Sequence, residues 1–316
     1  MKKMRIPLLI ALGVAIIGIV FGSFFDFQIS SAIASPTSGL GLTISAIGPT
    51  IGFMGVAIMA GGFIAFIIKG KYHIALKILF GVLATCCIGV SIFYPAGEYF
   101  GLNGFYKKAP EWVGYLIVLL PEVGAVVGGY FLFRNWQNKN LWIIFCIIIV
   151  LLLIALLAII PNIKDNMRRP RYRGLLLYND ISFHNWWEPF KEYKDMYAQK
   201  AADADITKEQ LKMFKENCKS YPSGHTAEAS IALVAVTFLP LADKKYEKIQ
   251  LPLFLGACGL VLLVAFARIL AAAHYLSDVS WGATIVISLL VIANEVVMRI
   301  KALQIKEEAP QEKEAE

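Results

Sequence analysis

Charged residues are scarce in this chain. Asp, Glu, Lys and Arg make up 17% of its 316 residues, whereas 58% are hydrophobic and the mean hydropathy is +0.63. Average soluble domains carry about 25% charged residues. This balance excludes an ordinary soluble domain and indicates an integral membrane protein.

Cysteine is also scarce, and its spacing excludes two kinds of site. The chain has five cysteines and no Cys-x-x-Cys pattern. Four of them lie in apolar runs, and only Cys218 lies in a polar segment. We therefore expect neither a disulfide framework nor a thiolate metal site.

Long apolar runs dominate the sequence. A helix needs about 20 apolar residues to cross a hydrocarbon core that is about 30 Å thick. Such runs occupy residues 6–25, 51–68, 78–94, 112–133, 141–160, 251–273 and 279–300, and a shorter run occupies residues 226–240. The sequence therefore predicts an all-α fold, a polytopic membrane bundle of about eight transmembrane helices.

The distribution of cations predicts the orientation of these helices. Residues 26–50 contain no Lys or Arg, so we expect an outer loop there, with a helix lying along the membrane surface. The next outer loop contains only Lys107 and Lys108. Most cations of the short loops fall on the opposite side: Lys2, Lys3, Arg5, Lys69, Lys71, Arg134, Lys139, Lys244, Lys245, Lys248, Arg299 and Lys301. Short cytoplasmic loops carry the excess of Lys and Arg, so both termini are predicted to be cytoplasmic.

One outer segment contradicts this rule. The stretch KDNMRRPRYR, residues 164–173, lies in the predicted outer loop 161–222 and contains five cations. Binding of an anion at the outer surface explains such a cluster. For Arg168 and Arg169 we favour pairing with lipid head groups over a part in the site. Further along this loop, Thr207 and Gln210 predict a capped short helix that ends near Cys218.

His274 and Asp278 are four residues apart, so they share one face if the segment is helical. An aspartate that accepts from one imidazole nitrogen fixes the tautomer and leaves the other nitrogen free as nucleophile or base. Arg268 precedes them near the same end of an apolar run. These residues also fit a structural ion pair between Arg268 and Asp278, and alone they do not decide between the two interpretations.

The stretch PSGHT, which begins at Pro222, lies at the start of the shorter apolar run. Gly224 allows backbone to approach a ligand, and Ser223 and the first amides of the helix can donate to an anion. On its own, the stretch is better explained by a helix cap formed by Ser223. Two histidines, His225 and His274, on one predicted side with a cluster of cations favour the anion site.

Together these motifs resemble the type 2 phosphatidic acid phosphatase superfamily, a family of membrane lipid phosphatases. Its signatures are Lys-x6-Arg-Pro, Pro-Ser-Gly-His and Ser-Arg-x5-His-x3-Asp. Lys164 and Arg171 have the spacing of the first signature, with Tyr172 in place of proline. The pair Arg169 and Pro170 would align Asn162 with the lysine, so we prefer the first alignment. The second signature is intact, and the third has Ala267 in place of serine.

The resemblance implies a phosphatase that needs no metal or cofactor. His274, held by Asp278, would attack phosphorus and form a phosphohistidine, and His225 would act as acid and base. The phosphate would be bound by Lys164, Arg171, Arg268, Ser223 and Gly224. Its partner would be a membrane lipid phosphate, and we expect no nucleic acid. Phosphatidate, phosphatidylglycerophosphate, a prenyl diphosphate and a sphingoid phosphate fit these charges equally well.

The family has a core of six helices, which suggests a division of the chain. Residues 1–72 would be additional N-terminal helices, and residues 73–303 would form the phosphatase core. The charged tail, residues 304–316, is predicted to be disordered. A rival interpretation is a non-enzymatic transporter or flippase for lipid phosphates, with the intramembrane Glu122 on an ion path. A vanadate-dependent haloperoxidase fits the membrane setting poorly.

Overall fold

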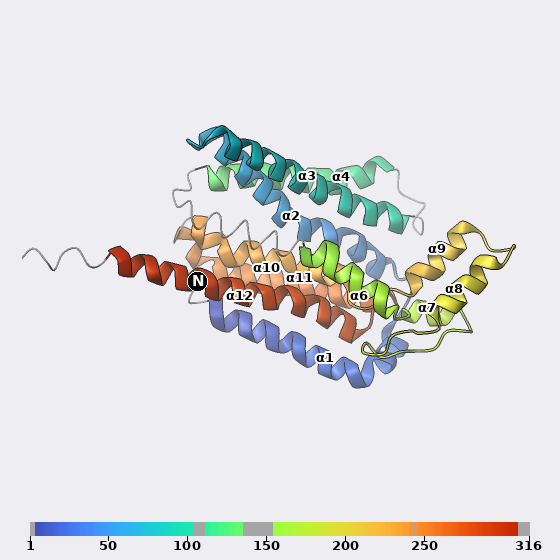
Figure 1. The fold of residues 1–316 in the computed structure, drawn as a ribbon. Helices are drawn as coiled ribbons and strands as arrows, with labels where there is room; N and C mark the ends of the chain where they lie inside the picture. The colour runs from blue at the N-terminus through green and yellow to red at the C-terminus, as the bar shows by residue number, and fades with distance from the viewer. Residues whose placement is uncertain (1–3, 104–110, 135–153, 243, 309–316) are drawn as a thin grey trace, which may run out of the picture.

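Long helices lie side by side along one direction in the computed structural model of the chain (Figure 1). The structure describes residues 4–103, 111–134, 154–242 and 244–308, and every regular element in these ranges is a helix. These elements are α1 (Arg5–Ile33), α2 (Gly39–Lys69), α3 (Ile74–Asn103), α4 (Glu111–Phe133), the π-helical turn η2 (Ala155–Ile159), α6 (Ile160–Met167), α7 (Tyr172–Leu177), α8 (Tyr193–Ala202), α9 (Lys208–Asn217), α10 (Gly224–Ala242), the 3₁₀ turn η3 (Lys244–Lys248), α11 (Gln250–Leu270) and α12 (Leu276–Glu308).

Within the described residues, six helices are long and apolar enough to cross a membrane: α1, α2, α3, α4, α11 and α12. The chain is therefore an all-helical, multi-pass membrane protein. The predicted run 226–240 forms most of α10, and the run 141–160 lies largely outside the described residues. The count of eight crossings thus stays a prediction.

The predicted extent of the loop at residues 26–50, with a helix along the membrane surface, is wrong. α1 continues to Ile33 and α2 begins at Gly39, so only residues 34–38 connect them. The side chain of Ser38 accepts a hydrogen bond from the Gly41 amide and caps α2. The helix can continue past Asp26 because this carboxylate is buried against protein partners and does not face lipid.

α2 lies at the centre of the bundle, where it packs against α3, α4, α10 and α11 (Figure 1). A Cβ atom on Gly52 would collide with the carbonyl of Glu228 on α10, and one on Gly61 would collide with the carbonyl of Val126 on α4. Glycine is therefore required where these backbones meet. The segment 1–72, expected to be an addition, thus supplies a central helix that supports the start of α10.

The two ends of the bundle differ. Helices α7, α8 and α9 cover one end, and the start of α1 and the end of α12 lie toward the other (Figure 1). The predicted capped helix is confirmed as α9, where the Thr207 hydroxyl accepts from the Gln210 amide at 3.2 Å and the Gln210 side chain accepts from the Thr207 amide at 2.8 Å. α12 extends to Glu308, so the first residues of the tail expected to be disordered are helical.

Candidate active site

The three motif segments meet at the end of the bundle that α7, α8 and α9 cover. Lys164 lies on α6 and Arg171 precedes α7, while Ser223 precedes α10, which begins with Gly224 and His225. Arg268 lies in the last turn of α11, His274 in the link to α12, and Asp278 in the first turn of α12. All of the predicted site residues therefore come from the helix ends at this side.

The start of α10 is tied directly to α12. The Ser223 amide donates to the carbonyl of Asp278 at 2.9 Å, and Gly282 leaves room for this approach because a Cβ there would collide with the Ser223 carbonyl. The Ser223 hydroxyl accepts from the hydroxyl of Thr226 at 3.1 Å and from its amide at 3.4 Å. Ser223 thus caps the helix, and its own hydroxyl proton stays available to a ligand.

A sharp reversal between α11 and α12 positions His274. Ala272 has a φ of 53°, a left-handed conformation that is uncommon for alanine. The amides of Ala273 and His274 then both donate to the carbonyl of Arg268, at 3.1 and 3.3 Å. The imidazole is 1% exposed, and the turn brings it beside α12.

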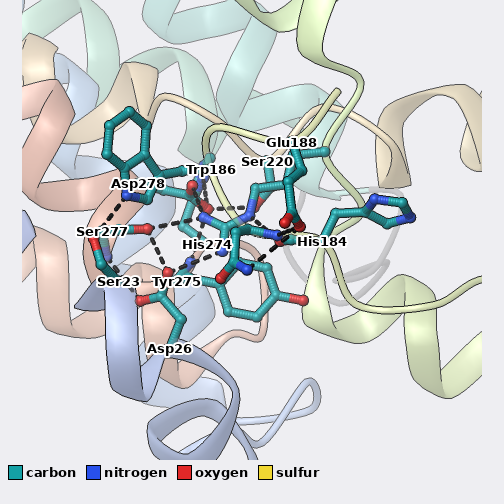
Figure 2. Close-up of polar contacts among 12 residues, drawn as sticks. Ser23, Asp26, His184, Trp186, Glu188, Ser220, His274, Tyr275, Ser277 and Asp278 are labelled. Atoms are coloured by element: carbon teal, nitrogen blue, oxygen red, sulfur yellow. Dashed lines mark hydrogen bonds and ion pairs between the residues drawn. The ribbon is translucent and has the colours of Figure 1, made fainter. Parts of the chain in front are cut away.

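The carboxylate of Asp278 is fixed by several donors (Figure 2). Its Oδ1 accepts from Nη1 of Arg169 at 2.5 Å, and its Oδ2 accepts from the hydroxyl of Ser220 at 2.5 Å and from the Tyr275 amide at 2.9 Å. Nδ1 of His274 lies 3.8 Å from Oδ2, close to the carboxylate but farther than a direct hydrogen bond. The structure therefore places His274 beside Asp278, as predicted. It also shows that Arg169, Ser220 and the Tyr275 amide hold the aspartate in place.

Arg169 is not a lipid-binding residue, contrary to the interpretation from sequence. Its side chain is 0% exposed and lies between two carboxylates, with Nη2 2.9 Å from Oδ2 of Asp26 and Nη1 2.5 Å from Oδ1 of Asp278. Nη1 also donates to the hydroxyl of Ser277, and Nε donates to the carbonyl of His184 at 2.8 Å. Burial lowers the pKa of a guanidinium, but the two carboxylates raise the pKa of Arg169 above its ordinary value.

Arg168 is also engaged within the protein. It ends α6 in the left-handed conformation, with a φ of 51°. Its Nη2 atom lies 2.8 Å from Oδ1 of Asp165, and its guanidinium lies over the ring of Tyr193. These contacts leave the arginine largely buried, so the lipid head-group interpretation is unsupported for it as well.

Three cations act on the histidines. Burial lowers the pKa of the His274 imidazole well below its ordinary value; the carboxylate of Asp278 opposes this shift, and the charges of Arg268, Arg171 and Lys164 add to it. His274 is therefore neutral at neutral pH and can act as a nucleophile. The charge of Arg171 acts on the His274 ring, whereas Arg169 binds the carboxylates of Asp26 and Asp278. This difference favours the alignment of the first family signature that pairs Lys164 with Arg171.

The sequence reasoning missed four supporting residues: Asp26, Arg169, Ser220 and Ser277. A signal existed for Asp26, because an acid directly after an apolar run requires a partner if the helix continues in the membrane. Ser220 and Ser277 have no signal in their spacing. They bind Asp278 and Asp26 only because the fold brings α1, α12 and the segment before α10 together.

A family comparison agrees with this arrangement. Residues 147–301 match the family described as the PAP2 superfamily. No curated protein and no solved structure matches the chain. The matched segment contains every residue predicted for the site, from Lys164 to Asp278, whereas Asp26 lies outside it. Over residues 147–301, the chain therefore belongs to the PAP2 superfamily.

Proposed function

We propose that the protein is a lipid phosphatase that removes the terminal phosphate of a lipid phosphate or prenyl diphosphate through a phosphohistidine. Membership of the PAP2 superfamily supports phosphatase activity, and the apolar helices support a substrate in the membrane. The observation that carries the proposal is the neutral, buried His274 backed by Asp278 and surrounded by the charges of Lys164, Arg171 and Arg268.

In the first step, Nε2 of His274 attacks phosphorus in line. The P–N bond forms as the P–O bond to the lipid breaks. Burial and the charge of Arg268 lower the pKa of His225 well below its ordinary value in the free site, and the negative charge of the bound phosphate favours the protonated ring. This imidazolium gives its proton to the departing oxygen. The cations neutralise the equatorial oxygens, with further donors from Ser223 and the first amides of α10. Because Asp278 lies beside Nδ1, that nitrogen keeps its proton and the positive charge that develops on the ring is stabilised.

In the second step, water attacks the phosphohistidine. His225, now neutral, takes a proton from this water, and the P–N bond breaks to release inorganic phosphate and neutral His274. Such acid and base catalysis typically contributes about 10²- to 10⁴-fold to the rate. The cycle restores both histidines without an added reactant other than water.

The transporter interpretation needs only the cations, because binding of a phosphate does not require a nucleophile. It leaves unexplained the carboxylate that is fixed beside His274 by Arg169, Ser220 and the Tyr275 amide. Release of phosphate from a panel of lipid phosphates by purified protein in detergent separates the two functions. Transfer of lipid between leaflets without phosphate release would favour the transporter.

Phosphate release is expected to continue without a divalent metal. Lys164, Arg171 and Arg268 already supply positive charge where a metal ion would otherwise act. Activity of the purified protein in EDTA should equal that in buffer with magnesium. Vanadate should inhibit it, because vanadate adopts the five-coordinate geometry of phosphoryl transfer.

A matched assay keeps this test specific. Sulfate at the same concentration as vanadate controls for general competition by anions. Loss of activity in EDTA that a divalent ion restores would contradict the assignment of these cations as the phosphate site.

The active site is proposed to face the extracytoplasmic side, with both termini in the cytoplasm. The cation pattern motivates this orientation, and α9 lies at the end opposite to the start of α1 and the end of α12 (Figure 1). Single cysteines at Glu209 of α9 and at Lys245 of η3, in a background without the five natural cysteines, should differ in labelling. An impermeant reagent applied to intact cells should label only the first position; labelling of only the second would reverse the orientation.

A further inference from the structure

A continuous set of buried charges joins α1 to the active site. The guanidinium of Arg169 lies between the carboxylates of Asp26 and Asp278, at 2.9 and 2.5 Å. The side chain of Asp26 is 2% exposed, and those of Arg169 and Asp278 are 0% exposed. Burial of three charges is costly unless each is compensated, so this arrangement requires a reason beyond packing.

Asp26 is held in place as firmly as Asp278. Its Oδ1 accepts from the Ser277 amide at 2.9 Å, and its Oδ2 accepts from the Ser277 hydroxyl (Figure 2). Oδ2 also accepts from Nη2 of Arg169. One turn earlier on α1, a Cβ on Gly22 would lie 2.6 Å from the Ser277 nitrogen. A glycine is thus required for α1 to approach the start of α12 closely enough for these bonds.

The charges of the set have a direct consequence for His274. Asp26 and Asp278 are negative and Arg169 is positive, so the set carries one net negative charge. Without Asp26, the guanidinium would neutralise Asp278 completely. A neutralised carboxylate is a weaker acceptor and a weaker counter-charge for an imidazolium, because the attraction of the ring to the pair would largely cancel.

The other charged groups around His274 make this negative charge important. Lys164 on α6, Arg171 before α7 and Arg268 on α11 are positive, and His225 faces it from α10. The carboxylate of Glu228 on α10 and the ammonium of Lys164 both lie near Gly224, and Asp278 on α12 lies beside Nδ1 of the ring. The cations that bind phosphate therefore oppose the positive charge that develops on His274 when it is phosphorylated.

We propose that Asp26 is a positioning residue that shares Arg169 with Asp278 and so preserves a net negative charge behind His274. This charge holds the Nδ1 proton on the ring and stabilises the phosphorylated imidazolium. The inference rests on the proposed phosphatase function for its meaning in catalysis. It gives α1, which lies outside the segment that matches the family, a defined part in the site.

The tautomer of His274 tests the proposal without any need for turnover. The chain has four histidines, so nitrogen-15 NMR of histidine-labelled protein in detergent can be assigned by single substitutions. In the unaltered protein, His274 should be mainly the Nδ1–H tautomer. Asp26→Asn should shift it toward a mixture of the two tautomers, because Asn keeps the shape and the bonds to Ser277 but removes the charge.

A turnover assay on the same variants adds a second measurement. Asp26→Asn should lower kcat about tenfold with little change in KM. This matches the lower end of the loss of about 10- to 100-fold that is typical when a residue that orients a metal-binding side chain is replaced. Asp180→Asn is the matched control, because that exposed aspartate pairs only with Lys200 among the described residues. It should change neither the tautomer nor kcat.

The double variant Asp26→Asn with Arg169→Gln separates charge from packing. It carries the same net charge as the original set, because only Asp278 remains, and Ser220 and the Tyr275 amide still hold that carboxylate. The proposal predicts that the double variant recovers the Nδ1–H tautomer and part of kcat relative to Asp26→Asn. It keeps the test valid even if Asp26→Asn alone does not fold.

Two results would overturn the proposal. One is an unchanged His274 tautomer in Asp26→Asn. The other is a double variant whose loss of kcat equals the sum, on a logarithmic scale, of the losses in Asp26→Asn and Arg169→Gln. Failure of the phosphatase function has a different signature: the unaltered protein would release no phosphate from any lipid, while the tautomer measurement would still report on Asp26.

Discussion

Replacement of His274 by alanine is expected to abolish both phosphate release and the covalent phosphoenzyme. Loss of a catalytic nucleophile lowers kcat by about 10⁴- to 10⁶-fold, because the residues that remain can bind the phosphate but cannot form the intermediate. The measurement is turnover of a lipid phosphate together with acid-labile radiophosphate on the protein after quenching.

His225→Ala is the informative partner of this variant. It should slow departure of the alkoxide and hydrolysis of the phosphohistidine, but p-nitrophenyl phosphate has a good leaving group and needs little acid catalysis. The His225→Ala protein should therefore still become labelled by this substrate. The motif PSGHT lies at the start of α10. In the proposed mechanism, both this imidazole and the helix N-terminus face the phosphate.

A third variant serves as the control. His73 is exposed and lies in the link between α2 and α3, away from the motif segments, so His73→Ala should leave turnover and labelling unchanged. Radiophosphate that persists on the His274→Ala protein would reverse the roles of the two histidines or exclude a phosphohistidine at this site.

Asp278→Asn is expected to lower kcat by about 10⁴-fold, the loss measured when an orienting aspartate becomes an amide in another enzyme. The amide can no longer favour the Nδ1–H tautomer. It also places an NH₂ group or a neutral oxygen against Arg169, whose charge is then balanced by Asp26 alone. Removal of one partner from a buried ion pair costs about 3–5 kcal/mol, so thermal stability should fall as well.

Two measurements separate catalysis from stability in this variant. Thermal unfolding in detergent gives the loss of stability, and the rate of radiolabelling by p-nitrophenyl phosphate gives the loss at the nucleophilic step. Asp180→Asn again provides the matched control at an exposed ion pair. A labelling rate within tenfold of the original would mean that the carboxylate does not serve His274.

The position of α10 shows what could be inferred from local pattern. Pro-Ser-Gly before an apolar run is typical of a helix start, and the helix begins at Gly224. The capped helix α9 was inferred correctly for the same reason, because its bonds join residues three apart in the chain. Neighbours in sequence determine such features, so tertiary structure is not needed to find them.

The segment at residues 26–50 shows where local pattern misled. The segment lies between two apolar runs and contains no Lys or Arg, which predicted an outer loop with a helix along the membrane surface. Asp26 and Ser45 are instead buried inside the bundle. The carboxylate is compensated by Arg169, which is more than a hundred residues away in the chain, and nothing at position 26 reveals that partner.

The sequence by itself determined the membrane setting, the helical class and the family motifs whose residues we propose bind phosphate, because composition and short spacings are local properties. Only the tertiary structure decided the different surroundings of Arg169 and Arg171. Arg169 and Arg171 are two residues apart, yet one is buried between two carboxylates and the other lies near the histidines. That difference arises from the turn after α6 and from the approach of α1 to α12, which depend on packing between distant segments.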